Sequence, residues 1–452
     1  MKKLSRKSQI ILYAASGFGV NMLNLMMGSY LCSALLAGGF AEEVKIFQTY
    51  TQDDLVIPAV WAIFAFIAKL VDGVIDIPMA AFTDSLRSRF GRRRPSLIIG
   101  MVPMILSFLL FLVIPDPTGP GMLNTVYYGI VLCIFYCSYT LTMVTYYATF
   151  TEIVETEDER SLMSNAKSVY DIFYFILGYV VVRMLLNGLN IRPVALIVLP
   201  LSLTMLIAVF MIKEPSSLDG HAGNTENSHV VNLVTSIRYA FKNKPFIIWM
   251  VVYSFMTFAV QLFLGGINEY FSYVGMSMML VMICSFAPVP FTLILYNHLQ
   301  RKKGFGFAFR YVLLTFSAGM IYTFVISFLQ AGTLKTVLSL TSGLVSSLSI
   351  GALFAVAYSI PSQLAADEEE KTGVSNSAMY FAVQGLFSGV ATGIGSGIVL
   401  TALKGSESSN SGAIRYLTLI CAIGTLVSYL LSHILPKSVT QIGQEEGRDK
   451  AE

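Results

Sequence analysis

Charged residues are scarce in this chain. Only 13% of its 452 residues are Asp, Glu, Lys or Arg, whereas 55% are hydrophobic. An ordinary soluble domain is about 25% charged and about 45–50% apolar. With a mean hydropathy of +0.68, the chain has more apolar surface than a soluble core can bury. The composition therefore predicts that lipid is the solvent for much of the protein.

Histidine and cysteine are also few, and their positions argue against several kinds of chemistry. Two of the four histidines lie in a polar segment (His221, His229) and two at the ends of apolar runs (His298, His433). No Ser, Cys or Asp has an evident histidine partner of the kind that nucleophilic catalysis needs. The cysteines lie inside apolar runs without the spacing of metal ligands: Cys32, Cys133, Cys137, Cys284 and Cys421. We expect no enzyme, no cofactor and no nucleic-acid partner.

Long apolar runs are what the chain has in abundance. A helix needs about 20 mostly apolar residues to cross a bilayer. Twelve runs meet this requirement, at 10–36, 56–82, 96–115, 125–150, 167–188, 192–212, 245–272, 275–297, 308–331, 335–364, 377–402 and 414–435. They lack the alternating pattern of barrel strands. The sequence thus predicts an all-α integral membrane protein with twelve transmembrane helices.

The basic residues predict how these helices are oriented. Most of the 30 Lys and Arg residues fall in every second connecting segment, with the densest group at 87–94, and Lys69 alone lies well inside a run. Basic loops stay on the cytoplasmic side during insertion. We therefore expect a multi-pass protein of the cell (cytoplasmic) membrane, embedded in the lipid bilayer, with both termini in the cytoplasm.

A long polar segment divides the runs into six and six. We predict an N-terminal six-helix bundle at 1–212, a cytoplasmic linker at 213–244, a C-terminal six-helix bundle at 245–436 and a cytoplasmic tail at 437–452. The helical apolar pattern of 230–244 predicts an interfacial helix within the linker. Two similar bundles with a substrate site at their interface are typical of secondary transporters.

Three ionisable residues interrupt the second run, in the segment "AKLVDGVIDIP". Lys69, Asp72 and Asp76 are spaced three and four residues apart, so they share one helical face. Such groups are costly inside a membrane, which favours a functional reason for them. Two neighbouring carboxylates suit Na⁺ as a metal ligand pair, or one of them carries a proton. Alternatively, Lys69 and Asp72 form a structural ion pair, which leaves Asp76 without a partner on its own helix. Pro78 is expected to free a backbone carbonyl nearby.

Other polar residues inside the runs carry weaker predictions. Asp171 lies one turn beyond Lys167, so a local ion pair is an alternative to a role in transport. Glu269 lies near the outer end of its run and is expected to be solvated there. Tyr147 belongs to an aromatic cluster suited to stacking on a sugar ring.

The motifs of the chain resemble one family of transporters. The segment "DGVIDIPMAAFTDSLRSRFGRRRP" (72–95), together with "GFGVN", "YYATFTEIVETEDER" and "QLAADEEEKTG" in order, is similar to the glycoside–pentoside–hexuronide:cation symporter family. This melibiose permease-like family belongs to the major facilitator superfamily. The resemblance implies the major facilitator fold and runs over nearly the whole chain.

The resemblance also implies roles for matching positions. The cation-binding residues would be Asp72, Asp76 and Thr140. The substrate-binding residues would be Asn21, Tyr147, Lys167 and Gln384, and we add Lys69 because it shares the face of the two acids. The gating loop would be formed by Asp84, Arg92, Arg93 and Arg94.

Several positions depart from the family pattern. Asn21 stands in place of an aspartate, Lys167 in place of an arginine, and Met143 in place of a third acid. These changes remove a charge, a bidentate donor and a potential cation ligand. They put melibiose itself in doubt as the substrate and leave Na⁺ and H⁺ both open as the coupling cation.

The sequence therefore predicts a secondary active transporter. It would couple Na⁺ or H⁺ to the symport of a sugar or glycoside by alternating access, with a glycoside, pentoside or hexuronide as the small-molecule partner. One alternative is a transporter of the same fold for an amphipathic lipid or drug-like solute. A second alternative is a membrane sensor that does not transport, because fold does not dictate function.

Overall fold

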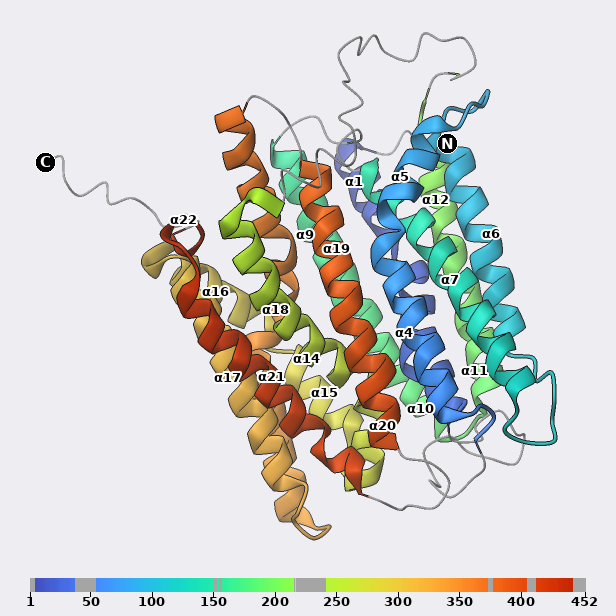
Figure 1. Ribbon diagram of the computed structural model, residues 1–452, viewed down its shortest axis with the longest axis vertical. Coiled ribbons are helices and arrows are strands. Elements are labelled where there is room, and N and C mark those ends of the chain that lie inside the picture. Colours follow the sequence, from blue (N-terminus) through green and yellow to red (C-terminus); the bar gives the residue numbers. More distant parts are fainter. Residues whose placement is uncertain are drawn as a thin grey trace, which may run out of the picture. The chain divides into compact units, whose positions relative to one another are not determined.

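The computed structural model describes residues 5–36, 54–149, 153, 157–214, 216, 241–372, 377–404 and 412–441 (Figure 1). These residues form helices and contain no strand. Ten of the described helices are long and apolar enough to cross a membrane, and one bent pair raises the number to 11. The remaining predicted run, 56–82, is also helical but is interrupted. The all-α membrane fold predicted from the sequence is confirmed.

The chain divides into two compact units. The first unit comprises Met1–Asn227 with Ser406–Asn410, and the second comprises Ser228–Gly405 with Ser411–Glu452. Residues 217–240, which include most of the predicted linker and its interfacial helix, lie outside the described residues, as do tail residues 442–452. The linker and tail boundaries stay predictions.

The helices of the first unit follow the first six predicted runs. They are α1 (Arg6–Ala15), α2 (Phe18–Met26), η1 (Met27–Leu31), α3 (Cys32–Ala34), α4 (Pro58–Val74), α5 (Asp76–Ser85), α6 (Arg93–Phe111), α7 (Met122–Ala148), α9 (Glu157–Ile176), η2 (Leu177–Val181), α10 (Val182–Leu186), α11 (Ile191–Val198), η3 (Leu199–Thr204) and α12 (Met205–Met211). Because α7 packs against α4, α5 and α6, it provides one wall for the charged face of the second run.

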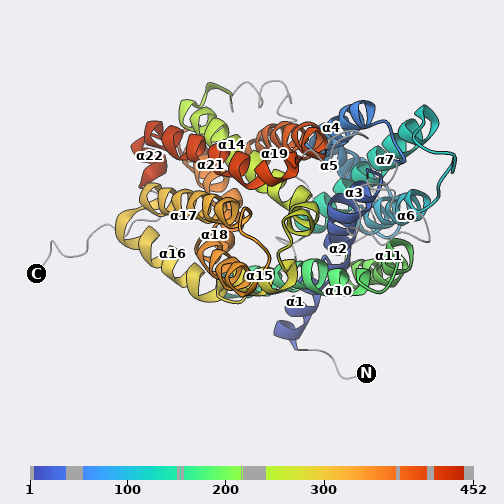
Figure 2. The ribbon, with the colours of Figure 1, turned by 90° about the horizontal axis from the view of Figure 1, so that it is seen from below.

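The helices of the second unit follow the other six runs. They are α14 (Lys244–Val274), α15 (Met278–Phe286), α16 (Val289–Lys303), α17 (Phe305–Ile326), α18 (Thr333–Thr372), α19 (Ser377–Thr392), η4 (Gly393–Val399), α20 (Leu400–Lys404), η5 (Ala413–Tyr416), α21 (Leu417–Leu431), η6 (Ser432–Ile434) and α22 (Lys437–Thr440). Seen end on, α17 lies beside α16 and α18 and also contacts α21 (Figure 2). The pair α15 and α16 is bent by 42°, where Pro288 interrupts the hydrogen-bond ladder.

The ends of α14 show how local sequence places a helix. The Asn243 side chain accepts a hydrogen bond from the Phe246 N–H, and Pro245 occupies the first turn, where no N–H is needed. The helix ends at Gly275, whose φ of 66° is left-handed and favours glycine. These signals bracket the long apolar segment between them, so the predicted run at 245–272 becomes one continuous helix.

Small residues and π-helical turns bring the spans of the first unit together. A Cβ atom at Gly19 would lie only 1.6 Å from the Leu201 carbonyl oxygen, so the backbones of α2 and η3 touch at this position. The π-helices η1 and η2 are joined by Tyr30, whose hydroxyl donates to the Gly178 carbonyl at 2.7 Å. Ser29 and Tyr179 share a second hydrogen bond of 3.2 Å. The first and fifth spans therefore pack closely at mid-length.

Candidate functional site

The second span breaks beside its charged residues. α4 ends at Val74 and α5 begins at Asp76, and the two helices follow one another as blue ribbons (Figure 1). Pro78 has no N–H to donate to the Val74 carbonyl four residues earlier, which gives the break its physical cause. The break places Asp76 in the first turn of α5, where a carboxylate interacts favourably with the helix dipole.

Lys69 and Asp72 are engaged with each other and with α7. Lys69 Nζ lies 3.7 Å from Asp72 Oδ2 and 3.7 Å from the centre of the Tyr136 ring. The Thr140 hydroxyl donates to Asp72 Oδ1 at 2.8 Å. The ion pair considered from the sequence is therefore present, and the two residues on α7 that hold it are one turn apart.

Asp76 has a different environment. Its side chain is half-buried, and it makes no hydrogen bond or ion pair with any residue that the structure describes. One turn beyond Thr140, the sequence of α7 has Met143 and Val144, which have no side-chain oxygen or nitrogen. Met143 is the position where the resembled family has a third acid. Asp76 is thus a carboxylate inside a span without a described counter-charge in direct contact.

A second polar cluster lies between α2, α7 and α9. Asn21 is buried, and its Oδ1 accepts a hydrogen bond from the Tyr139 hydroxyl at 3.1 Å. Lys167 donates to both carboxylate oxygens of Asp171, one of them at 2.6 Å. Lys167 Nζ lies 5.7 Å from the centre of the Tyr147 ring, which is 39% exposed. The local Lys167–Asp171 pair considered from the sequence is present.

One helix connects the two clusters. Tyr139 and Thr140 are neighbours on α7; the first contacts Asn21 on α2, and the second contacts Asp72 on α4. A change in the position of α7 would therefore move groups in both clusters. This connection is a feature of packing that the motifs did not predict.

The basic loop before α6 is attached to the end of the sixth span. Arg94 Nε donates to the Ile212 carbonyl at 2.5 Å. The Arg93 N–H donates to Glu214 Oε2 at 2.8 Å, and Arg93 Nε lies 3.3 Å from Glu214 Oε1. Gly91 has a φ of 85°, and a Cβ atom there would lie 2.3 Å from Glu214 Oε2. Gly91 and Arg93 thus both lie against the Glu214 carboxylate.

Glu214 was not predicted from the sequence. Its only local signal is an acid directly after the last apolar run of the first unit. Arg92 is the residue directly before α6, and its side chain makes no capping hydrogen bond there. The side chain of Asp84 lies outside the part of the chain that is described. The gating role of this loop stays a prediction.

The predicted residues of the second unit are buried and paired. Trp249 Nε1 donates to Gln384 Oε1 at 3.4 Å, and Gln384 is 7% exposed. Glu269 was expected to be solvated, but it is 4% exposed and lies 2.8 Å from Lys404 Nζ. That expectation is wrong because α20 packs against α14. Lys404, at the end of α20, pairs with the Glu269 carboxylate and shields it from solvent.

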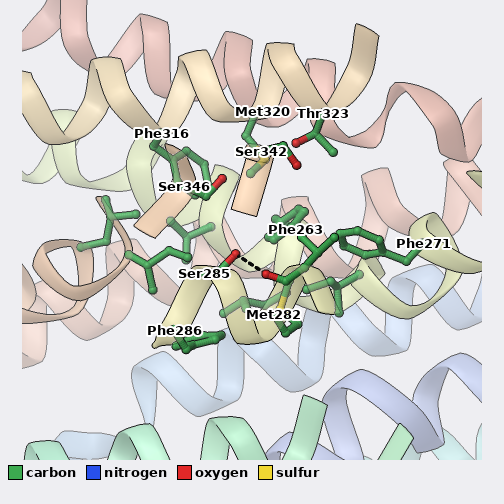
Figure 3. A pocket seen from close by; sticks show the side chains of 16 residues that line it. Phe263, Phe271, Met282, Ser285, Phe286, Phe316, Met320, Thr323, Ser342 and Ser346 are labelled. Carbon is green, nitrogen blue, oxygen red and sulfur yellow. Dashed lines mark hydrogen bonds between the residues drawn. The ribbon is translucent and has the colours of Figure 1, made fainter. Parts of the chain in front are cut away.

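A small apolar cavity lies between α14, α15, α17 and α18 (Figure 3). Its volume is about 40 Å³, and four phenylalanines help to line it. The polar groups in its wall are used by their own helices: Ser285 donates to the Val281 carbonyl, Ser342 to the Ser339 carbonyl and Thr323 to the Gly319 carbonyl. None of the predicted site residues lines this cavity, and no sequence signal marks it.

The geometry can be compared with known proteins. A family profile described as "MFS/sugar transport protein" matches residues 12–435. An uncharacterized symporter of Synechocystis sp. (strain ATCC 27184 / PCC 6803 / Kazusa) is 28% identical over 131 residues, which cover 28% of this chain and 24% of that protein. The match therefore spans about a quarter of that relative's length.

Several solved transporters share the fold. An inward-open xylose transporter XylE from E. coli aligns with a TM-score of 0.61 and 17% identity, over 96% of this chain and 97% of that one. The nucleoside transporter NupG aligns with a TM-score of 0.59 and 14% identity, over 96% and 98%. A bacterial homologue of the human lysosomal transporter Spinster gives 0.60 and 12%, over 97% and 98%. At these identities the likeness establishes the fold.

The family profile and the fold agree with each other. The profile spans nearly the whole chain, and each of these structures is a transporter. The major facilitator fold and the family resemblance inferred from the motifs are confirmed. The chain therefore belongs to the family of MFS/sugar transport proteins, and it is a multi-pass membrane transporter.

Proposed function

We propose that the protein is a secondary active transporter of the cell membrane that couples Na⁺ or H⁺ to the symport of a sugar or glycoside by alternating access. The observation that carries the proposal is Asp76, a half-buried carboxylate inside a span with no described hydrogen-bond or ion-pair partner. An unpaired charge at membrane depth is costly. A cation that binds there lowers this cost, so its occupancy can favour one state of the transporter over another.

The surroundings of Asp76 support a cation site. Asp72 lies one turn earlier. The Val74 carbonyl accepts no helical hydrogen bond from residue 78, because Pro78 has no N–H. Carboxylate and carbonyl oxygens are suitable ligands for a hard cation. A proton on Asp76 would remove the same charge without further ligands. Both cations therefore stay within the proposal.

The cluster around Asn21 supports a polar solute. Asn21 offers amide donors and acceptors, and Tyr147 offers a partly exposed aromatic face beside it. A sugar ring presents hydroxyls on its edge and C–H groups on its face, which match these two features. Lys167 is close enough to contact the same solute, as is implied by its distance to Tyr147. We propose Gln384 as a further contact from the second unit and the loop of Asp84 and Arg92–Arg94 as the gate.

The decisive experiment is uptake into proteoliposomes. Candidate glycosides, pentosides and hexuronides are supplied under an imposed Na⁺ or H⁺ gradient, and counterflow exchange is measured without a gradient. We expect Asp76→Asn to lose at least tenfold in gradient-driven accumulation while exchange persists. Accumulation by Asp76→Asn at the wild-type rate would contradict the coupling role. Binding of a solute without exchange would favour a sensor, and uptake of lysolipids alone would favour the lipid-transporter alternative.

Asp116→Asn is the matched control. Asp116 lies in the loop before α7, where the Thr118 N–H and hydroxyl donate to its Oδ1 at 3.0 and 2.6 Å. These hydrogen bonds hold the pKa of the Asp116 carboxyl below its usual value. The variant removes one carboxylate charge from the first unit outside the spans. We expect it to accumulate solute as the wild type does.

A further inference from the structure

One face of α16 is exposed along its length and changes from apolar to basic. Phe291 and Ile294 are 74% and 67% exposed, and Leu295 is 39% exposed. Arg301 and Lys302, seven and eight residues after Ile294, are exposed as well. Such spacings place the five side chains on the same side of the helix. At 1.5 Å per residue, the basic part begins about 9 Å beyond the apolar part.

The basic end of this face continues onto α17. Lys303 Nζ lies 4.2 Å from the centre of the Phe307 ring, which is 43% exposed. The face of an aromatic ring attracts a cation, so the ammonium group is held at the junction of the two helices. Only Gly304 separates α16 from α17. α17 also packs against α22, whose first residue is Lys437 (Figure 1).

No acidic residue balances these cations within the helices that carry them. The sequences of α16, α17, α21 and α22 contain no Asp or Glu. Arg301, Lys302 and Lys303 form no ion pair with any residue that the structure describes. Arg310 differs, because its guanidinium donates to the Ser432 hydroxyl and carbonyl at 3.2 and 3.0 Å. The charge at the end of α16 is therefore available to a partner outside the protein.

An anionic phospholipid matches both parts of this face. The basic segment lies on the predicted cytoplasmic side, where the lipid head groups include anionic ones that attract Lys and Arg near the membrane surface. A phosphate is a bidentate acceptor for an arginine. A lipid with a neutral head group would leave the cations unpaired, and a soluble acidic partner would leave the apolar side chains uncovered.

We propose that the exposed face of α16 and the start of α17 form a binding site for one anionic phospholipid. Its acyl chain lies along Phe291 and Ile294, and its phosphate contacts Arg301, Lys302 and Lys303. The site lies within the second unit and uses none of the residues assigned to the solute, the coupling cation or the gate. It is therefore independent of the proposed function.

Native mass spectrometry of the full-length protein tests the site. Phosphatidylglycerol and phosphatidylcholine with the same acyl chains are offered in equal amounts, and we expect one phosphatidylglycerol to be retained in preference. Lys302→Gln with Lys303→Gln should lower its affinity at least fivefold. Lys242→Gln with Lys244→Gln removes the same charge from exposed positions at the start of α14 and should leave the affinity unchanged. Equal losses in both variants, or no preference in the wild type, would overturn the proposal.

Fluorescence quenching in bilayers locates the lipid. Leu295→Trp places a reporter on the apolar part of the face, and Val325→Trp is the control because Val325 is 58% exposed near the other end of α17. The native Trp61 and Trp249 are 2% and 0% exposed. In phosphatidylcholine bilayers, we expect a small fraction of chain-brominated phosphatidylglycerol to quench Leu295→Trp at least threefold more than the same fraction of brominated phosphatidylcholine.

The control variant and a competing anion complete this experiment. Val325→Trp should be quenched equally by both brominated lipids, and Lys302→Gln with Lys303→Gln should remove the difference at Leu295→Trp. Inorganic phosphate should not relieve the quenching, because it has no acyl chain to lie along α16. Equal quenching of Leu295→Trp by both lipids, or relief by inorganic phosphate, would overturn the proposal.

Discussion

At the scale of single residues, the partners of a carboxylate decide whether it can serve a mobile ion. Asp72 and Asp76 are one turn apart on the same span, yet only Asp72 is held by Thr140 and Lys69. A hydrogen bond to a charged group contributes about 1.5–3 kcal/mol. The hydroxyl of Thr140 therefore stabilises Asp72 in its charged form and fixes its direction.

Thr140→Val tests this contact, because valine keeps the shape of threonine but cannot donate. We expect the protein to lose about 1.5–3 kcal/mol of stability, the range of a hydrogen bond to a charged group. Asp72 would then be free to turn toward Asp76, so the apparent affinity for the coupling cation should change severalfold. Thermal unfolding and cation titrations of uptake measure both effects. Thr140→Ser keeps the hydroxyl and should resemble the wild type; a Thr140→Val protein with wild-type stability and cation dependence would refute the assignment.

Buried pairs elsewhere show that a charge inside a span is not by itself a sign of transport. Glu269 and Lys404 are both almost fully buried and lie 2.8 Å apart within the second unit. Lys335 is also buried, but its ammonium donates to the carbonyls of Val274 and Leu329 near the ends of two helices. Such groups are accounted for by local partners, and this difference singles out Asp76.

At the scale of helices, the break between α4 and α5 makes Asp76 the first residue of a new helix. α4 ends at Val74, and a new helix starts at Asp76 itself. Proline is the cause, because its nitrogen cannot donate to the Val74 carbonyl and its ring crowds the preceding turn. The loss of one backbone hydrogen bond is thus part of the construction of the site.

Pro78→Ala is expected to join α4 and α5 into one continuous helix. The alanine N–H would donate to the Val74 carbonyl, and helix stability should rise, since proline in a helix interior costs about 3 kcal/mol. We expect a higher melting temperature together with a severalfold loss of gradient-driven uptake, because Asp76 would no longer begin a helix and the Val74 carbonyl beside it would be hydrogen-bonded. Pro103→Ala is the control, since Pro103 lies inside α6, which is continuous, and its uptake should be unchanged. If Pro78→Ala transports as well as the wild type, the break has no role in coupling.

At the scale of the whole molecule, the basic segments and the apolar runs set the topology. The loop 86–92 before α6 is rich in arginine, whereas the loop 112–121 before α7 has no Lys or Arg. Because these loops lie at opposite ends of α6, the positive-inside tendency places the first in the cytoplasm and the second outside. The predicted position of the gating loop depends on this orientation.

Cysteine labelling checks the orientation. A membrane-impermeant maleimide applied to intact cells should label Thr118→Cys and leave Ser88→Cys unlabelled, and permeabilised cells should show labelling of both. The five native cysteines are buried or half-buried, so the wild-type protein serves as the background. Labelling of Ser88→Cys alone in intact cells would show that the orientation is reversed.

Part of the candidate site was predictable from the sequence, and part was not. The spacing of Lys69, Asp72 and Asp76 placed them on one face, because helical periodicity is local. Whether Lys69 forms an ion pair with Asp72 was left open, and the structure shows this pair. Tyr136 and Thr140 decided it, and they come from a helix distant in sequence. In the same way, the ion pair between Arg93 and Glu214 forms because two spans pack together.

The sequence by itself determined that the chain is helical, that it lies in lipid and which family it belongs to. Run length, charge scarcity and ordered motifs suffice for this, because a backbone in lipid must satisfy its hydrogen bonds within each span. Only the tertiary structure decided which buried charges are compensated. Glu269 forms an ion pair with Lys404, and Lys69 forms one with Asp72. Asp76 forms no ion pair with a described residue. Helix packing brings distant side chains within a few ångströms of one another, and no local pattern in the sequence records those distances.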